Sequence, residues 1–254
     1  MSFSVLIRTH NRIEDLKLAI NSVMGQKLPP KEILVLDDLN QETVKDVIKE
    51  KNKEYNTNNI FYINTKNKYN SLKNLNLNVN KCRGEFLAFL DDDDTWNEEY
   101  LKTNFKILDN YDVIYTNFYE IDNLKKEIFK IKKLDFKDKI LKNNGFLISN
   151  LIVKKNLFYF LECFDHKLNS SADKDFYLKA KKSELKIYIQ KIPLVNYNSS
   201  LLKEKWRWSN DYLSTLPGVL MFYKKYFRQI SFLYHLKMIK KIVIFSLLSI
   251  RQVF

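Results

Sequence analysis

The chain has 254 residues, with 43 Lys or Arg against 30 Asp or Glu, so its formal net charge at pH 7 is +13. Hydrophobic residues make up 45%, and only four Gly and four Pro are present, which excludes disordered, collagen-like and linker-rich proteins. Its two cysteines cannot build a disulfide framework, so we expect a reducing compartment. No apolar run approaches the ~20 residues of a membrane-spanning helix, and no secretion leader is visible, so we expect a cytosolic protein.

The first half of the chain alternates short apolar runs with segments of helical periodicity. Strands are predicted at 4–9, 32–38, 60–64, 85–94 and 112–117, and helices at 12–26, 42–54 and 70–81. Strands that alternate with helices indicate βαβ units, and hence a mainly parallel sheet that is covered on both faces. The predicted fold class is therefore α/β.

The second half is less regular. The pattern predicts a hairpin or loop and then a short helix in 121–142, a strand at 149–155, a helix at 173–183, and a strand at 187–197 that Pro193 interrupts. From about residue 201 the chain becomes aromatic and basic, with ten Lys or Arg and two acids. We therefore expect one domain of residues 1–200, followed by a basic helical extension of residues 201–254.

Two clusters of acids follow predicted strands, Asp37–Asp38 and Asp91–Asp94. Ligands of open α/β sheets bind beyond the carboxyl ends of the strands, where both clusters would lie. A single Asp there more often begins a loop or caps a helix. Consecutive carboxylates, however, repel one another unless a cation neutralises them. Mg²⁺ and Mn²⁺ prefer oxygen ligands, so the second cluster predicts metal-assisted chemistry on a phosphate.

Four segments, in this order, carry a resemblance to a known family: SVLIRTHNR, EILVLDD, SLKNLN with CRGEFLAFLDDDDTW, and FDHKLNSSADKDFYLKA. Over about residues 2–200 they resemble the motifs of family-2 glycosyltransferases, which have the Rossmann-like GT-A fold. The resemblance implies that residues 1–200 transfer a sugar, with inversion, from a nucleotide-sugar such as a UDP-sugar. It implies Mn²⁺ or Mg²⁺ as cofactor and a surface-glycan acceptor such as lipooligosaccharide, capsule or O-antigen.

The same resemblance implies roles for individual residues. Asp93 would hold the metal, and Asp173, at the start of a predicted helix, would be the catalytic base toward the acceptor. The other matching positions would bind the nucleotide-sugar: Thr9, Asn11, Arg12, Asp37, Asp38, Lys73, Asn74, Asp91 and Asp92. The chain departs from the family pattern at Arg8 and His10, which replace the usual Pro and Tyr. Asp175 lies two residues beyond Asp173 and competes with it for the role of base.

The C-terminal extension holds two features outside these motifs. Trp206 and Trp208 could stack on a sugar ring or anchor the tail on the core. Residues 217–254 combine an apolar stretch with flanking Lys and Arg, which is typical of a helix on an anionic membrane surface. The alternative is a helix that packs on its own domain or on a second subunit. We expect a peripheral position on the cytoplasmic face of the inner membrane.

Two other functions fit parts of the pattern. A nucleotidyltransferase also uses strand-end acids and a metal, but it normally carries a Gly-rich phosphate loop, which SVLIRTHNR lacks. A basic nucleic-acid-binding protein would explain the net charge. Acids in the ligand crevice would repel a phosphate backbone, however, and no motif of a nucleic-acid module is visible. We therefore expect no nucleic-acid partner.

Overall fold

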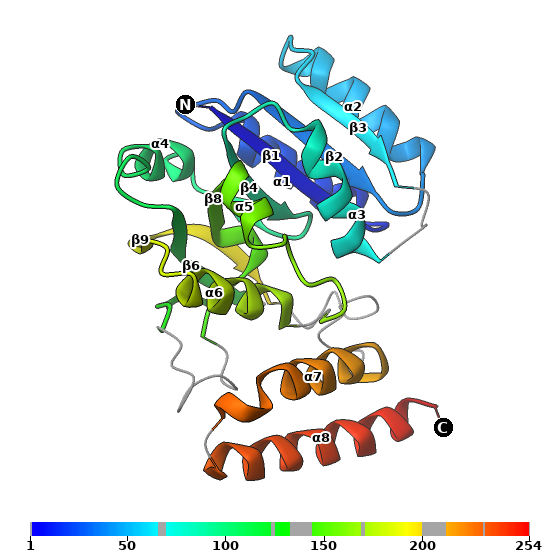
Figure 1. Cartoon of the computed structure of the whole chain (residues 1–254). Coiled ribbons are helices and arrows are strands. Elements are labelled where there is room, and N and C mark those ends of the chain that lie inside the picture. Colours follow the sequence, from blue (N-terminus) through cyan, green and yellow to red (C-terminus); the bar gives the residue numbers. More distant parts are fainter. Residues whose placement is uncertain are drawn as a thin grey trace.

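A nine-stranded mixed sheet forms the centre of the described part of the chain (Figure 1). The computed structural model describes residues 2–65, 70–122, 125–132, 144–168, 171–199, 212–230 and 232–253. Its strands follow the order β3-β2-β1-β4-β8-β6-β9-β5, and β7 pairs with β6. Their bounds are β1 Phe3–Thr9, β2 Glu32–Asp37, β3 Ile60–Asn64, β4 Phe86–Asp91, β5 Thr95–Trp96, β6 Val113–Asp122, β7 Lys125–Phe129, β8 Leu151–Lys154 and β9 Ile187–Asn198.

Helices cover both faces of this sheet. Their bounds are α1 Ile13–Met24, α2 Glu42–Glu54, α3 Ser71–Asn78, α4 Tyr100–Phe105, α5 Lys155–Phe160, α6 Ala172–Lys182, α7 Tyr212–Tyr226 and α8 Phe232–Val253. In the central strand β1, Leu6 belongs to the apolar cluster that α3, α5 and α6 complete, whereas Val5 and Ile7 belong to the cluster of α1, α2 and α4. Burial on two faces explains why apolar residues run without alternation from Val5 to Ile7, and the expected α/β fold is confirmed.

The sheet is parallel in its first half and mixed in its second. β1 pairs in parallel with both β2 and β4, and β2 pairs in parallel with β3. β8 then runs antiparallel to β4 and β6, while β9 returns parallel to β6. Of the hairpin or loop expected in this region, the structure shows the hairpin pairing, with β6 and β7 antiparallel.

Several bounds differ from the sequence predictions. Pro193 lies within β9 and does not end it; instead the pairing with β6 shifts register between Thr116 and Phe118. Pro cannot donate to the ladder, so a bulge accommodates it. The short helices α4 and α5 were not expected, and β6 runs five residues beyond the expected end at residue 117. The short helix expected within 121–142 falls mostly on 133–143, outside the described residues, as does the domain boundary near residue 201.

The register of the parallel strands brings polar residues to one edge of the sheet. Thr9 lies opposite Asp37, and Asp37 lies opposite Asn64. On the other side of β1, Arg8 lies opposite Asp91. The two acid clusters therefore occupy the same edge, at the carboxyl ends of the strands, as the sequence predicts.

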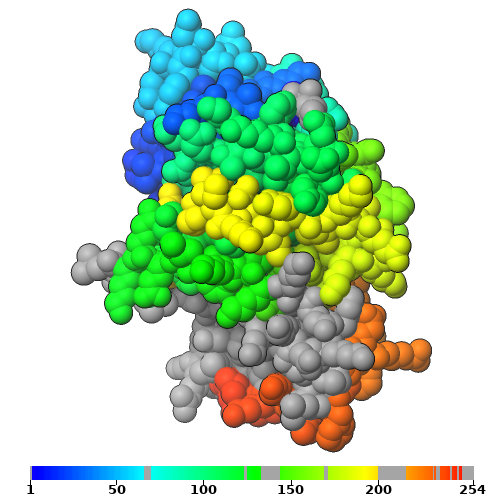
Figure 2. Space-filling view, turned by 90° about the vertical axis from the view of Figure 1, so that its left-hand side faces the viewer, coloured from blue at the N-terminus to red at the C-terminus, as the bar shows by residue number. Residues whose placement is uncertain are grey.

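α7 and α8 extend the molecule beyond the sheet. α7 buries Phe222 and Tyr226 in the same apolar cluster as α6, and α8 lies along α7 on the side away from the sheet (Figure 1). In the space-filling view the blue and cyan N-terminal elements lie at one end of the molecule and the orange and red tail at the other (Figure 2). Part of the tail is therefore packed on its own domain. No helix among the described residues is long and apolar enough to cross a membrane.

Gly84 lies where the segment before β4 passes β1. A Cβ at this position would come within 2.7 Å of the Ser4 Oγ and of the Phe3 carbonyl carbon. We expect Gly84→Ala to lower the free energy of unfolding by about 1–3 kcal/mol, because backbone would have to move. At Gly25 the nearest atom, the Asn21 carbonyl oxygen, would be 3.3 Å away, so Gly25→Ala should stay within about 1 kcal/mol of the parent. Urea denaturation measures both, and equal stabilities would contradict the β1–β4 packing.

Candidate active site

Two arginines lie at this edge of the sheet, one at the end of β1 and one in the loop that follows it. Asn11 adopts a positive φ of 56°, which Asn tolerates better than most residues. Its Oδ1 accepts a hydrogen bond from Gln41 Nε2 at 2.9 Å, which ties this loop to the loop after β2. Arg12 follows directly and occupies the N-cap position of α1, without a side-chain capping hydrogen bond. Arg8, two residues before His10, still belongs to β1.

These arginines neutralise the acids at the end of β4. Arg8 forms an ion pair with Asp91, its register partner. Arg12 contacts Asp92, and its Nη1 lies 2.7 Å from the Asp93 Oδ2. Burial would lower the pKa of Arg12, but Asp92 and Asp93 outweigh it and raise that pKa. The chain itself thus supplies part of the positive charge that four adjacent carboxylates require.

The four acids differ in their surroundings. Asp92 is fully buried, and it accepts a hydrogen bond from the His10 amide at 3.2 Å. Burial, with Asp93 adding to it, raises the pKa of Asp92 to about 6 against the opposing charge of Arg12. Asp94 is also buried and accepts a hydrogen bond from the Asn198 amide at 3.0 Å, so it holds β9. Asp91 and Asp93 keep part of their surface exposed and are the members that can meet a ligand.

The acids after β2 build the floor of the neighbouring region. Asp37 is fully buried, and its carboxylate accepts hydrogen bonds from the Leu39 amide at 2.9 Å and from the Tyr62 hydroxyl at 3.0 Å. Burial and the charge of Asp37 raise the pKa of Tyr62. In this structure Asp37 therefore organises its own loop. Its contact with a nucleotide stays a prediction.

Asp38 links the sheet to α3. Its Oδ1 accepts hydrogen bonds from the Thr65 hydroxyl and from the side-chain Nδ2 of Asn74, both at 3.0 Å. Asn74 is buried, whereas its neighbour Lys73 is half-buried in the first turn of α3. The structure thus joins Asp38 with Asn74, and their contact with a nucleotide stays a prediction.

Asp173 lies in the first turn of α6 and is half-buried. Its Oδ1 accepts a hydrogen bond from the Lys174 amide at 2.7 Å. Burial raises the pKa of Asp173 to about 6; Lys174 opposes the shift and the charge of Asp91 adds to it. The interaction with Asp91 connects α6 electrostatically to the acid cluster of β4. That the predicted base and the predicted metal-binding segment form one site stays a prediction.

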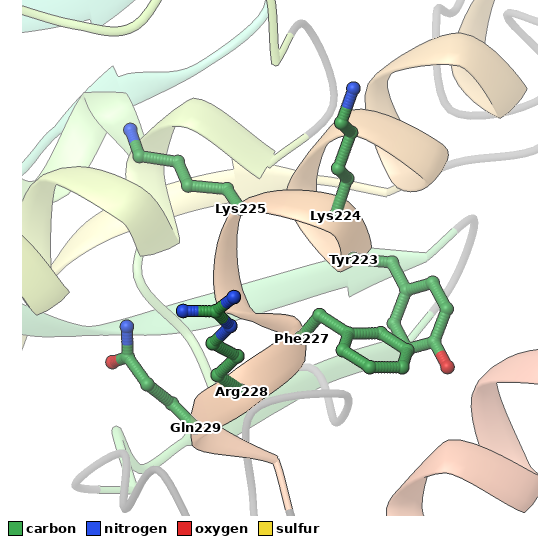
Figure 3. A pocket seen from close by; sticks show the side chains of 6 residues that line it. All are labelled: Tyr223, Lys224, Lys225, Phe227, Arg228 and Gln229. Carbon is green, nitrogen blue, oxygen red and sulfur yellow. The ribbon is translucent and has the colours of Figure 1, made fainter.

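Asp175 is committed to a different task. It is fully buried and accepts a hydrogen bond from the Tyr226 hydroxyl at 2.7 Å. The Lys225 Nζ lies 2.6 Å from its Oδ1 and 2.8 Å from the Asp165 carboxylate. Figure 3 shows Lys225 pointing from the end of α7 toward α6. Asp175 therefore anchors the tail on the core, which leaves Asp173 as the better candidate for the base.

The sequence reasoning missed several residues that shape the site. Arg8 was noted only as a departure from a motif, yet its place beside β4 makes it the partner of Asp91. Tyr62 and Thr65 hold the β2 acids, and nothing in their local sequence marks them. Trp206 and Trp208 lie outside the described residues.

The side chains at this edge of the sheet decide whether a divalent cation could bind there. Within the described ranges, no three His, Cys, Asp or Glu side chains lie close enough to hold a metal ion by themselves. Asp93 nevertheless offers a partly exposed carboxylate, and Mg²⁺ is often held by one or two carboxylates together with phosphate oxygens of a substrate. The residues therefore fit a cation that arrives with a phosphorylated substrate.

Comparison with known proteins identifies the family. Residues 4–168 match the family model described as Glycosyl transferase family 2. The chain belongs to this family. An uncharacterized glycosyltransferase of Methanocaldococcus jannaschii is 30% identical over 76% of this chain and 69% of that protein. A GalNAc(5)-diNAcBac-PP-undecaprenol beta-1,3-glucosyltransferase of Campylobacter jejuni is 34% identical over 36% of this chain and 29% of that protein.

The fold is also that of a solved glycosyltransferase structure. The crystal structure of residues 1–349 of S. aureus TarS, in complex with UDP-GlcNAc, aligns with a TM-score of 0.64 and 21% identity. The alignment covers 86% of this chain and 64% of that fragment. The expectations of a family-2 glycosyltransferase and of the GT-A fold are confirmed.

The role of Asp175 as the anchor of the tail can be tested by measuring the stability of a variant. We expect Asp175→Asn to lower the free energy of unfolding by about 3 kcal/mol, because the substitution removes one partner of a buried ion pair. Asp46→Asn is the matched control, since it breaks only the exposed pair with Lys49 and should cost at most about 0.5 kcal/mol. Thermal and urea unfolding measure both variants. If Asp175→Asn is as stable as the control, Asp175 does not anchor the tail.

Proposed function

We propose that the protein transfers a sugar from a UDP-sugar to a hydroxyl group of a surface glycan, with inversion at the anomeric carbon. The proposal is carried by the partly exposed carboxylates of Asp91 and Asp93 at the end of β4, together with the half-buried carboxylate of Asp173 in the first turn of α6. The first suits a diphosphate with a cation, and the second suits a hydroxyl that must lose a proton. The TarS complex with UDP-GlcNAc, a protein of the same fold, supports the donor class.

On the donor side, we assign the nucleotide to the edge formed by Thr9, Asn11, Asp38 and Asn74, next to Asp91. A bound Mn²⁺ or Mg²⁺, held by Asp93, would supply the positive charge that stabilises the leaving diphosphate. Arg12 lies beside Asp93 and adds a fixed positive charge at the same place.

On the acceptor side, Asp173 takes the proton of the attacking hydroxyl. With a pKa of about 6, roughly nine in ten Asp173 side chains are ionised at pH 7, and the group is a stronger base than an ordinary carboxylate. A single displacement with inversion needs one base and no covalent nucleophile. The site offers one such carboxylate in Asp173, since the neighbouring Asp175 is occupied by Lys225 and Tyr226.

For the acceptor we propose a glycan on a lipid carrier, of the lipooligosaccharide, capsule or O-antigen kind. The Campylobacter relative, whose name specifies an undecaprenol-linked acceptor, supports this class. Because such an acceptor is confined to a membrane, we place the enzyme peripherally on the cytoplasmic face of the inner membrane. Membership of the family favours this function over a nucleotidyltransferase or a nucleic-acid-binding protein.

A donor screen tests the proposal. Nucleotide-sugars are added one at a time with Mn²⁺, and we expect a UDP-sugar to raise the Tm most, because a ligand of the folded state stabilises it. Asp93→Ala should abolish the metal-dependent part of this rise and the transfer reaction, whereas the exposed control Asp46→Ala should keep both. Full transfer activity in excess EDTA would contradict the role of the metal.

The pH dependence of transfer tests the base. A carboxylate acts as base only when ionised, so we expect the rate to fall as the pH drops through about 6, the pKa of Asp173. Asp173→Asn should lower turnover by ~10²–10⁴ with little change in donor affinity. Single-turnover assays and donor titrations measure the two effects. If Asp175→Asn, assayed at a temperature where it is folded, loses turnover without losing donor affinity and Asp173→Asn does not, then Asp175 is the base and not Asp173.

A further inference from the structure

α8 exposes a continuous apolar stripe. Five large side chains on this helix are between 51% and 77% exposed: Phe232, Leu236, Ile239, Val243 and Leu247. They recur every three or four residues and therefore lie on one face of the helix. We call these five residues the α8 stripe.

A neighbouring side of α8 holds the helix in place. Met238 is buried, and His235 contacts two aromatic residues of the preceding segment, Tyr223 and Phe227. The Tyr223 hydroxyl lies 2.8 Å from the His235 Nδ1. Figure 3 shows Tyr223 and Phe227 pointing toward α8, on the other side of α7 from Lys225. Because α8 is fastened by this second face, the stripe contributes little to the fold.

The positive charge around the α8 stripe indicates what kind of surface it binds. Residues 212–254 contain seven Lys or Arg and neither Asp nor Glu. Lys237 and Lys240 are exposed on the stripe-bearing helix itself. A second copy of the chain would bring two strongly basic tails together, which is unfavourable, whereas an anionic lipid surface has the complementary charge. A partner that is apolar within and negative at its surface fits both properties of α8.

The same helix cannot cross a bilayer. No described helix is long and apolar enough to do so, and Lys237 and Lys240 interrupt the apolar sequence of α8. We propose that α8 lies flat in the interface of an anionic membrane, with the stripe among the acyl chains and these two lysines at the headgroups. α7 packs on α6 through Asp175, so a docked α8 would hold the helix of Asp173 near the lipid surface. Only this last consequence depends on the proposed function.

The test is sedimentation of the full chain with vesicles. We expect binding to vesicles that contain phosphatidylglycerol, weak binding to phosphatidylcholine alone, and partial release as salt screens the charges. The variant Leu236→Ser/Ile239→Ser/Val243→Ser removes the centre of the stripe and should weaken binding at least tenfold. Its Tm should match the parent, because all three side chains are exposed.

A matched control removes the same amount of exposed apolar surface elsewhere. Leu18, Ile128 and Ile192 are 53–57% exposed and lie on α1, β7 and β9. Leu18→Ser/Ile128→Ser/Ile192→Ser should therefore bind vesicles as the parent does.

Three results would overturn the proposal: no binding of the parent to anionic vesicles, equal loss in both triple variants, or a stripe-dependent dimer in analytical ultracentrifugation. The rise in Tm with a UDP-sugar is measured on the same samples. If the Tm still rises with a UDP-sugar but the protein does not bind vesicles, only the membrane proposal is refuted. If the protein binds vesicles but its Tm does not rise, only the proposed donor is refuted.

Discussion

Acids can gather at the end of β4 only because positive charge is built in next to them. Arg8 reaches Asp91 across the parallel pair of strands, and Arg12 reaches Asp92 and Asp93 from the start of α1. Without these contacts the carboxylates would repel one another or take up protons, and the turn after β4 would lose its shape. The register of β1 and β4, set by apolar burial on two faces of the sheet, is what makes the contacts possible. Packing in the core therefore determines the electrostatics at the edge.

A second charged contact, away from the acid cluster, fixes the position of α6. Asp175 fixes α6 against α7, and the same helix carries Asp173, the proposed base, in its first turn. Two residues along a helix correspond to a rotation of about 200°, so these carboxylates lie on nearly opposite faces. Asp175 contacts the tail, and Asp173, the proposed base, lies on the other face of α6. This division explains how two similar side chains in one short segment can serve different purposes.

The parallel half of the fold was readable from the sequence because β1, β2 and β4 are buried on both faces, and because a helix of eight or more residues follows each of β1, β2 and β3. α4 and α5 have six residues each, too few for a clear apolar stripe, and were missed. Among the site residues, the acid clusters were found because repeated charges after an apolar strand are unusual. The partners Arg8, Tyr62 and Lys225 were not, because their roles depend on strand register and on the docking of a distant helix. The choice between Asp173 and Asp175 likewise required the position of α7.

The contact between α6 and α7 has a consequence for how such a chain can change in evolution. A chain that lost α7 would keep a buried carboxylate at position 175, and its remaining ion-pair partner among the described residues would be Lys179, whose Nζ lies 3.7 Å away. Loss of the tail would therefore be tolerated only together with a change of that acid to a neutral residue. We therefore expect α7 and the acid at position 175 of α6 to be kept or lost together, although the two helices are separated by some thirty residues of sequence.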